Sequence, residues 1–285
     1  MVDKTYKYIK VDKLDGITWL TLNRPEKRNA MSPALHAEMD DALFELEDDP
    51  DTKVVILKGA GGNFSAGQDL KEFFRANENN PRGRRKAAQD ANRWRWERLY
   101  NYDKPTICMI EGYCVGGAFM QLLATDFVVC AEDATFSLSE VNWGILPGAL
   151  VSKVVADAVL YRHALWYACL GEPFDGKEAV RVGFANVAVP NDKLVEETEK
   201  LAKKLMLKSP RVLRATKQAI RHVRNMDFGQ AYDYLAEKGR AIKVGDSEKS
   251  YETGLSQFLD KKSYKPVHGA FKLGTAIADE TKGKK

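Results

Sequence analysis

The chain has 285 residues, of which 44% are hydrophobic and 29% are charged, and its formal net charge at pH 7 is +4. This length and composition suit a globular protein with a sizeable core, and so small a positive charge gives no reason to expect nucleic-acid binding. No apolar run is long enough to span a membrane, and the first residues lack the apolar segment of a signal peptide. The four cysteines show no metal-ligand spacing. We therefore expect a cytoplasmic protein with reduced core thiols, no metal and no membrane partner.

The first hundred residues alternate between strand and helix patterns. Residues 6–22 predict a hairpin, and residues 33–46 predict a helix. Residues 53–57 predict a buried strand. Residues 77–86 are polar and basic, with a glycine and a proline, and they predict a mobile loop over a binding site. Residues 87–102 return to helical spacing.

The stretch at residues 104–148 is the one around which the chain is organised. An apolar strand pattern at residues 106–110 leads to Gly116 and Gly117, and a helical segment follows at residues 119–124. Glycine lets the backbone approach a ligand closely, and the first N–H groups of a helix lack intrahelical partners and attract negative charge. The N–H of Gly117 is therefore a candidate donor to an oxyanion. The alternative is that the two glycines only mark a tight turn.

A second strand also ends in a glycine-rich turn. Residues 53–72 read KVVILKGAGGNFSAGQDLKE, and this spacing matches neither a P-loop nor a dinucleotide-binding loop. If the two glycine turns meet, the N–H groups of Gln68 and Gly117 converge on one oxygen atom from two sides. Such a pair of donors is suited to an enolate or to a tetrahedral oxyanion.

Glu140 is the candidate general acid and base. It lies in a mostly apolar stretch, after Phe136 and close to Trp143. A carboxyl group in such surroundings has a raised pKa, which suits proton transfer near neutral pH. The residues alone favour equally a structural carboxylate that caps the following turn.

The order of elements predicts the organisation of the chain. Strand and helix patterns alternate through the first two thirds, and three helix patterns then follow at residues 193–207, 210–224 and 229–244. We therefore expect an α/β core over residues 1–205 and a helical C-terminal region and tail over residues 206–285, which together form one functional unit.

Four motifs in this order resemble the crotonase (enoyl-CoA hydratase/isomerase) superfamily. They are NRPEKRNA at 23–30, SAGQDL at 65–70, Gly116-Gly117, and Ser139-Glu140 with the turn at 144–148. The resemblance implies a spiral of ββα repeats with a helical C-terminal trimerisation region, and hence a homotrimer or a dimer of trimers. It implies an acyl-CoA substrate and no tightly bound cofactor, because coenzyme A is part of the substrate. It also assigns the oxyanion hole to Gln68 and Gly117, and the acid/base role to Glu140.

The resemblance assigns further residues by position. The residues that would contact coenzyme A are Lys27, Arg28, Ala66, Asp69, Leu70, Lys265, Phe271 and Lys272. The residues of the acyl pocket would be Phe73, Met120, Trp143, Gly144, Tyr232 and Ala236. Without the resemblance, Lys27 and Arg28 read as an exposed charged loop, and Asp69 reads as a brace for the oxyanion loop.

Within the superfamily, the chain is most similar to hydratase-lyases that act on hydroxycinnamoyl-CoA thioesters. The motifs that carry this likeness are NAMSP at 29–33, DLKE at 69–72, WRW at 94–96, LSEVNWG at 138–144 and QFLDKKS at 257–263. The likeness implies hydration and then retro-aldol cleavage of feruloyl-CoA or 4-coumaroyl-CoA. The products would be acetyl-CoA and an aromatic aldehyde, vanillin or 4-hydroxybenzaldehyde.

Three positions depart from the hydratase-lyase pattern. Phe73, Met120 and Ala236 stand where that pattern carries hydroxyl groups. A buried phenol oxygen without a partner is costly, so another residue, such as Tyr232 one helical turn before Ala236, replaces them or the substrate differs. The alternatives are an enoyl-CoA hydratase or other acyl-CoA lyase with a more apolar substrate and, more remotely, a non-catalytic scaffold of the same fold.

Overall fold

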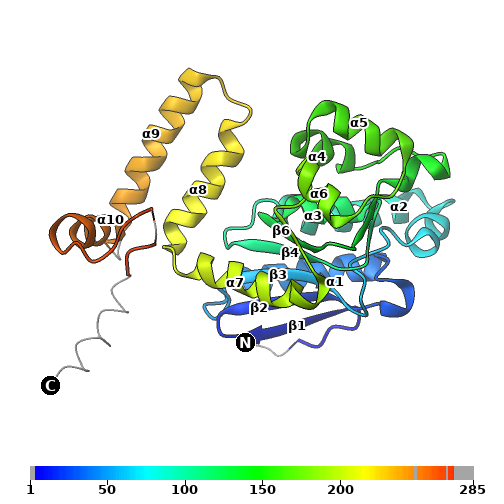
Figure 1. Ribbon diagram of the computed structural model, residues 1–285. Helices are drawn as coiled ribbons and strands as arrows, with labels where there is room; N and C mark the ends of the chain where they lie inside the picture. The colour runs from blue at the N-terminus through cyan, green and yellow to red at the C-terminus, as the bar shows by residue number, and fades with distance from the viewer. Residues whose placement is uncertain (1–3, 247–248, 268, 273–285) are drawn as a thin grey trace. The chain divides into compact units, whose positions relative to one another are not determined.

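A computed structural model describes residues 4–246, 249–267 and 269–272 of the chain. The chain divides into two compact units, Met1–Ala202 and Lys203–Lys285. The first unit is an α/β structure and the second is helical, as the order of the sequence patterns predicted (Figure 1). Within the described ranges, no helix is both long enough and apolar enough to cross a membrane.

A six-stranded sheet forms the centre of the first unit. Its strand order is β1-β2-β3-β4-β6-β8. The predicted hairpin is confirmed, since β1 and β2 pair antiparallel, whereas all later neighbours pair in parallel. The strands in the middle of this sheet are almost entirely buried, as is typical of parallel strands covered on both faces. The bounds are β1 Ile9–Leu14, β2 Ile17–Leu22, β3 Val54–Gly59, β4 Thr106–Ile110, β6 Phe127–Ala131 and β8 Val187–Val189.

A second, two-stranded sheet was not expected from the sequence. It pairs β5 (Tyr113–Val115) with β7 (Thr135–Ser137) in parallel. Each strand has only three residues, so neither shows a periodicity that local sequence patterns could reveal. This short sheet matters because both of its strands lead directly into the candidate site.

Helices cover the sheet of the first unit. Helix α1 begins after Ser32, whose hydroxyl accepts a hydrogen bond from the N–H of Leu35. It packs against α2 and against η4, the wider-turned continuation of α2. The helices are α1 Pro33–Glu47, α2 Pro81–Asn92, α3 Ala118–Ala124, α4 Val151–Ala158, α5 Tyr161–Leu170, α6 Gly176–Val182 and α7 Leu194–Met206. The short helical turns are η1 Pro25–Lys27, η2 Leu70–Phe74, η3 Arg75–Asn77, η4 Arg93–Leu99, η5 Ser139–Trp143 and η6 Asn191–Lys193.

The prediction of a loop over residues 77–86 was wrong. Helix α2 begins at Pro81, and the side chain of Asn80 caps it by accepting from the N–H of Gly83 at 2.9 Å. An asparagine followed by a proline is a helix-start signal, since proline at the first helical position needs no N–H partner. The polar composition of the segment hid this signal.

The second unit consists of helices with their own packing. Helix α8 contacts α9, and α9 begins with a capping box formed by Asp227 and Gln230. The bounds are α8 Pro210–Val223, α9 Phe228–Val244, α10 Ser250–Leu255 and η7 Ser256–Asp260.

Candidate active site

Three chain segments pair side by side in parallel, and the candidate catalytic groups come a few residues after the paired positions. Ser65 pairs with Cys114 through an isolated parallel bridge, and Cys114 pairs with Phe136 between β5 and β7. Parallel segments end at the same edge, so residues that follow each by a similar number of positions are brought together. The groups that follow by three or four positions are Gln68, Gly117 and Glu140.

The first glycine turn is held against the second by close backbone contact. Gly67 has a φ of +88°, and a Cβ atom there would lie 2.7 Å from the carbonyl oxygen of Val115. The Ser65 hydroxyl donates to the carbonyl of Asn29 at 2.8 Å and accepts from the N–H of Gly67 at 3.1 Å. Only glycine satisfies both the positive φ and the contact at residue 67.

Two backbone N–H groups face the resulting space. In the parallel bridge between Met31 and Gln68, the bonds are made by the carbonyl of Gly67 and the N–H of Asp69, so the N–H of Gln68 points the other way. A Cβ atom on Gly117 would lie 3.6 Å from the nitrogen of Gln68. Neither N–H donates to another residue in the described part of the chain. Two neighbouring amides without protein partners are the composition of an oxyanion hole.

Glu140 is a buried carboxyl group beside these amides. Its side chain belongs to η5, the residue is 9% exposed, and its Oε2 atom has no hydrogen-bond partner among the described residues. A Cβ atom on Gly116 would lie 3.3 Å from Glu140 Oε1, so the glycine leaves open the space in front of the carboxyl. Burial raises the pKa of Glu140, and a hydrogen bond with its own backbone offsets part of that rise. The group is thus suited to donating and accepting a proton near neutral pH.

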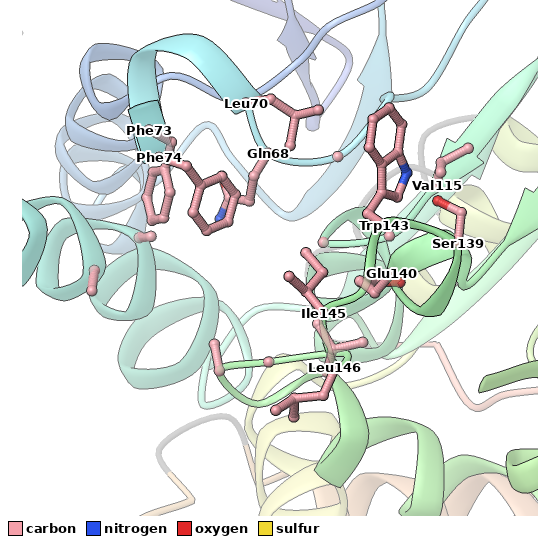
Figure 2. A pocket seen from close by; sticks show the side chains of 18 of the residues that line it. Gln68, Leu70, Phe73, Phe74, Val115, Ser139, Glu140, Trp143, Ile145 and Leu146 are labelled. Carbon is pink, nitrogen blue, oxygen red and sulfur yellow. The ribbon is translucent and has the colours of Figure 1, made fainter. Parts of the chain in front are cut away.

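These groups open onto one cavity of about 810 Å³, a size typical of small-molecule sites. Figure 2 shows Phe73 and Phe74 on one side of it and Trp143 on the other, with Gln68 between them and Glu140 close to Trp143. Glu140 is the only carboxylate among the described residues that line the cavity. Most of the lining is apolar. The cavity can therefore hold an apolar or aromatic group between one acid/base and two amide donors.

A buried chain of hydrogen bonds orients the side chain of Gln68. The indole N–H of Trp94 donates to His36 Nδ1 at 2.8 Å, so the imidazole proton is on Nε2, which donates to Gln68 Oε1 at 2.8 Å. Burial and the positive charge of Arg95 lower the pKa of His36 to about 3. The histidine is therefore neutral at physiological pH and acts as a fixed support.

The structure places three of the six predicted acyl-pocket residues and two of the predicted coenzyme A contacts along the cavity. Ala66, Leu70, Phe73, Trp143 and Gly144 line it together with Gln68, Gly117 and Glu140. Met120 is not among the lining residues, and at 1% exposure its side chain is enclosed within the core around α3.

Asp69, Lys27 and Arg28 lie outside the cavity lining. Asp69 is ion-paired to Arg24 at 3.0 Å, and it caps η2 by accepting from the N–H groups of Lys71 and Glu72. Lys27 and Arg28 are exposed, at the end of η1 and just after it. Asp69 is thus the brace that its position in the loop suggested, and the coenzyme A contacts of the other two stay predictions.

Five predicted residues belong to the second unit. Tyr232 and Ala236 lie one turn apart on α9, and Tyr232 is exposed. Phe271 lines a separate cavity of about 440 Å³ within this unit, Lys265 is exposed, and the backbone of Lys272 is bonded to the side chain of Gln257. Their contacts with a substrate stay predictions.

Two residues at the site were missed by the sequence reasoning. His36 has no spacing that links it to Gln68 or Trp94, so only the folded chain reveals its role. Arg95 lines the cavity, and it belongs to a stripe with Ala88, Ala91 and Asn92 at helical spacing. That stripe was the signal that would have found it. The described residues contain no group of three or more His, Cys, Asp or Glu side chains placed to hold a metal ion.

Comparison with known proteins agrees with this geometry. The enoyl-CoA hydratase/isomerase family model matches residues 12–266. The chain belongs to this family. Among curated relatives of this enoyl-CoA hydratase/isomerase, hydroxycinnamoyl-CoA hydratase-lyase of Pseudomonas fluorescens is 47% identical over 94% of this chain and 97% of its own. Carnitinyl-CoA dehydratase of Escherichia coli K12 is 32% identical over 77% of this chain and 82% of its own.

Solved structures share the fold across the chain. Enoyl-CoA hydratase from Bacillus anthracis superposes with a TM-score of 0.82 at 29% identity, covering 90% of this chain and 97% of that one. Human enoyl coenzyme A hydratase domain-containing protein 3 also gives a TM-score of 0.82, at 26% identity over 90% of this chain and 98% of that one. The protein therefore has the crotonase fold and is an enzyme of a family that implies an acyl-CoA substrate.

Proposed function

We propose that this enzyme is a hydratase-lyase that converts a 4-hydroxycinnamoyl-CoA, such as feruloyl-CoA or 4-coumaroyl-CoA, to an aromatic aldehyde and acetyl-CoA. The observation that carries the proposal is the lone buried carboxylate of Glu140 facing two free amides in a largely apolar cavity. The 47% identity to hydroxycinnamoyl-CoA hydratase-lyase supports the same substrate class.

A single carboxylate favours a substrate that assists its own hydration. With no second acid among the described lining residues, electron density must come from elsewhere to draw water to the β-carbon. A para-oxygen on the ring supplies it, because its lone pair can shift through the ring and alkene towards the thioester carbonyl. Glu140 then gives a proton to the α-carbon, which leaves a quinone-methide that accepts water at the β-carbon.

The cleavage half of the reaction uses the same groups. Glu140 takes a proton from the adding water, releases it to solvent, and then takes the proton of the new β-hydroxyl. The Cα–Cβ bond breaks, leaving the aldehyde and an acetyl-CoA enolate, whose oxygen accepts from the N–H groups of Gln68 and Gly117. Protonation of the enolate carbon by Glu140 gives acetyl-CoA, so the net change is the addition of one water and the breakage of one carbon–carbon bond.

A second candidate is hydration of a more apolar enoyl-CoA without cleavage. The observation in its favour is the aromatic wall of Phe73 and Phe74, which carries no hydroxyl. Crotonyl-CoA turnover without an aldehyde product is the expected behaviour of that enzyme.

The deciding experiment compares four thioesters with purified protein. Feruloyl-CoA and 4-coumaroyl-CoA should yield aldehyde, whereas cinnamoyl-CoA and crotonyl-CoA should not. Glu140→Gln should lower kcat by roughly 10²–10⁴-fold, the usual contribution of a general acid/base. Glu172→Gln, at an exposed glutamate, is the matched control and should keep full activity. Aldehyde formation unchanged in Glu140→Gln, or hydration of crotonyl-CoA alone, would overturn the proposal.

The remaining roles extend the proposal to binding and assembly. Lys27 and Arg28 would contact coenzyme A, whereas Lys265, Phe271 and Lys272 would reach the coenzyme A of a neighbouring subunit. The chain would act in the cytoplasm as a trimer or dimer of trimers. Charge removal at Lys27 and Arg28 together should raise KM for the thioester while leaving kcat nearly unchanged. Light scattering would give the number of chains, and a monomer active at assay concentration would contradict the assembly.

A further inference from the structure

Arg95 is a buried cation on the wall of the cavity, and it has no anionic partner among the described residues. It is 2% exposed and lines the cavity along with Gln68 and Gly117. Its guanidinium donates to the carbonyl of Ala91 at 2.8 Å and, at a long 3.4 Å, to that of Gly117. No carboxylate in the described parts of the chain lies within ion-pair distance of it. Both of its acceptors are neutral, so its charge is left without compensation.

The other fully buried arginine of the first unit shows what is missing. Arg24 is 4% exposed and is paired with Asp69 at 3.0 Å and with Glu72 at 2.7 Å. Buried charges are normally paired in this way, because an isolated ion loses its hydration without return. Burial lowers the pKa of Arg95 to about 10, so the group is still charged at neutral pH. A bound ligand that carries a negative charge would supply the partner that Arg95 lacks at the cavity wall.

The surroundings of Arg95 fit one end of an aromatic acyl group. Ala88 and Ala91, which precede it on the same stripe, are small and leave the wall open towards the guanidinium. The positive charge of Arg95 contributes to the lowered pKa of His36, and His36 contacts Phe73 edge-on, with ring centroids 5.7 Å apart. Arg95 lines the same cavity as Phe73, together with Ala91 and Asn92. A flat ring against this wall can present its outer oxygen to the guanidinium.

We propose that Arg95 binds the para-oxygen of the substrate ring as a phenolate and so supplies the polar contact that Phe73, which has no hydroxyl group, cannot make. This inference rests on the proposed function and names the residue that selects its substrate. The phenol proton leaves to solvent, the guanidinium holds the oxygen, and the oxygen lone pair is available to the conjugated thioester. An arginine suits this role because its planar fork offers two donors and a charge that persists at any physiological pH.

The test uses a background that binds but does not turn over. In Glu140→Gln protein, we would titrate the absorbance of bound 4-coumaroyl-CoA, whose phenolate absorbs at longer wavelength than its phenol, and measure Kd for 4-coumaroyl-CoA and cinnamoyl-CoA. Adding Arg95→Met should cut the preference for the phenolic thioester about tenfold to a hundredfold, the equivalent of one charged hydrogen bond. It should also return the phenol pKa of the ligand to its value in solution. Arg95→Lys, which keeps the charge and loses the fork, should fall between.

The controls separate binding from folding. Arg93→Met changes an exposed arginine of the same helical turn that does not line the cavity, and it should leave both readouts unchanged. Exchange of a buried ion for an apolar side chain of similar volume is often tolerated, and Arg95→Lys provides the comparison if Arg95→Met does not fold.

The outcomes distinguish this inference from the proposed function. Aldehyde production by the wild-type enzyme, together with an unchanged phenol preference in both Arg95 variants, would overturn the role of Arg95 and leave the hydratase-lyase intact. No aldehyde from the wild type, with a phenol preference that still depends on Arg95, would sustain the anion site and overturn the reaction.

Discussion

The two sides of the cavity are built in different ways. The reaction side consists of the N–H groups of Gln68 and Gly117 and the carboxyl of Glu140, all placed by the register of three parallel segments. The other part, which we call the acyl side after its proposed occupant, consists of lining side chains such as Phe73 and Arg95 on η2 and η4, together with their neighbours on α2. Most substitutions leave the backbone register unchanged, whereas each substitution in a wall of side chains alters the shape and chemistry of that wall. The reaction class can therefore persist across the family while the acyl group varies.

This contrast agrees with the solved relatives. Enoyl-CoA hydratases superpose at TM-scores of about 0.8 while sharing 26–29% of their residues with this chain. A common backbone is enough to carry an oxyanion hole, because its donors are main-chain groups. Substitutions that displace the backbone donors should thus lower the turnover of every substrate alike. Substitutions of side chains in the acyl wall should instead change the selectivity between substrates.

The largest effect that sharpens this comparison is expected from Gly67→Ala. The new methyl group would meet the carbonyl oxygen of Val115 at 2.7 Å and lie 3.3 Å from the nitrogen of Gly117, which forces the two glycine turns apart. Loss of one oxyanion donor lowers kcat by about 10²–10³-fold. The fall should be the same for every thioester that the enzyme turns over, and steady-state kinetics on two of them would measure it.

Gly62→Ala is the matched control for that variant. Gly62 also has a positive φ, +74°, but a Cβ atom there meets nothing within 4 Å. Both variants carry the backbone strain of about 1 kcal/mol, and only Gly67→Ala adds the clash. Equal activity in the two would show that the meeting of the glycine turns does not govern catalysis.

The sequence predicted the reaction side better than the acyl side. Glycine turns and an isolated glutamate are local signals that made Gln68, Gly117 and Glu140 candidates, and the family resemblance assigned their roles. The register that joins them depends on β5 and β7, three residues each, which no local periodicity reveals.

The acyl side was predicted less well, and some of the contacts that support it join residues far apart in the sequence. Met120 was expected in the pocket by position and lies in the core, whereas Arg95, in the middle of the WRW motif, was given no role of its own and lines the cavity. His36 and Trp94 are separated by 58 positions and meet only in the folded chain. Helix and strand types follow from short-range patterns, but the partner of a buried polar group does not.

A smaller effect is expected where the two sides meet, at the support of Gln68. Trp94→Phe removes the donor to His36 Nδ1 and leaves a buried acceptor unpaired, which should lower the free energy of unfolding by about 1–3 kcal/mol. It also frees the imidazole proton to move to Nδ1, so the bond to Gln68 Oε1 loses its fixed donor. We expect kcat to fall several-fold, far less than in Gly67→Ala, with KM nearly unchanged. Denaturant unfolding and steady-state kinetics would measure both.

Trp96→Phe is the control that distinguishes loss of the hydrogen bond to His36 from a general loss of aromatic packing. Trp96 lies two residues away, is 40% exposed and stacks on Tyr100. It should leave kcat unchanged and cost little stability. Equal kinetics in Trp94→Phe and Trp96→Phe would mean that the backbone alone positions the oxyanion donors and that the buried chain is only structural.

The smallest expected effect is a pH dependence of the free energy of unfolding. It arises because the reaction side contains the buried carboxyl group of Glu140. Burial raises the pKa of Glu140 in the folded state above its ordinary value of 4.5, so the folded protein holds this proton more tightly than the unfolded chain. The stability that this proton contributes is complete below pH 4.5 and is lost as the pH rises through the folded-state pKa.

Glu140→Gln keeps the shape and removes the titration, so it should exceed wild type in stability by about 1–2 kcal/mol at pH 7. This advantage should disappear below pH 4.5. Urea unfolding of both proteins across this pH range would measure it, with Glu172→Gln, at an exposed glutamate, as the control. A variant less stable than wild type at pH 7 would mean that the ionised carboxylate has a stabilising partner in the assembled enzyme. In that case the reaction side, like the acyl side, would depend on side chains as well as on backbone register.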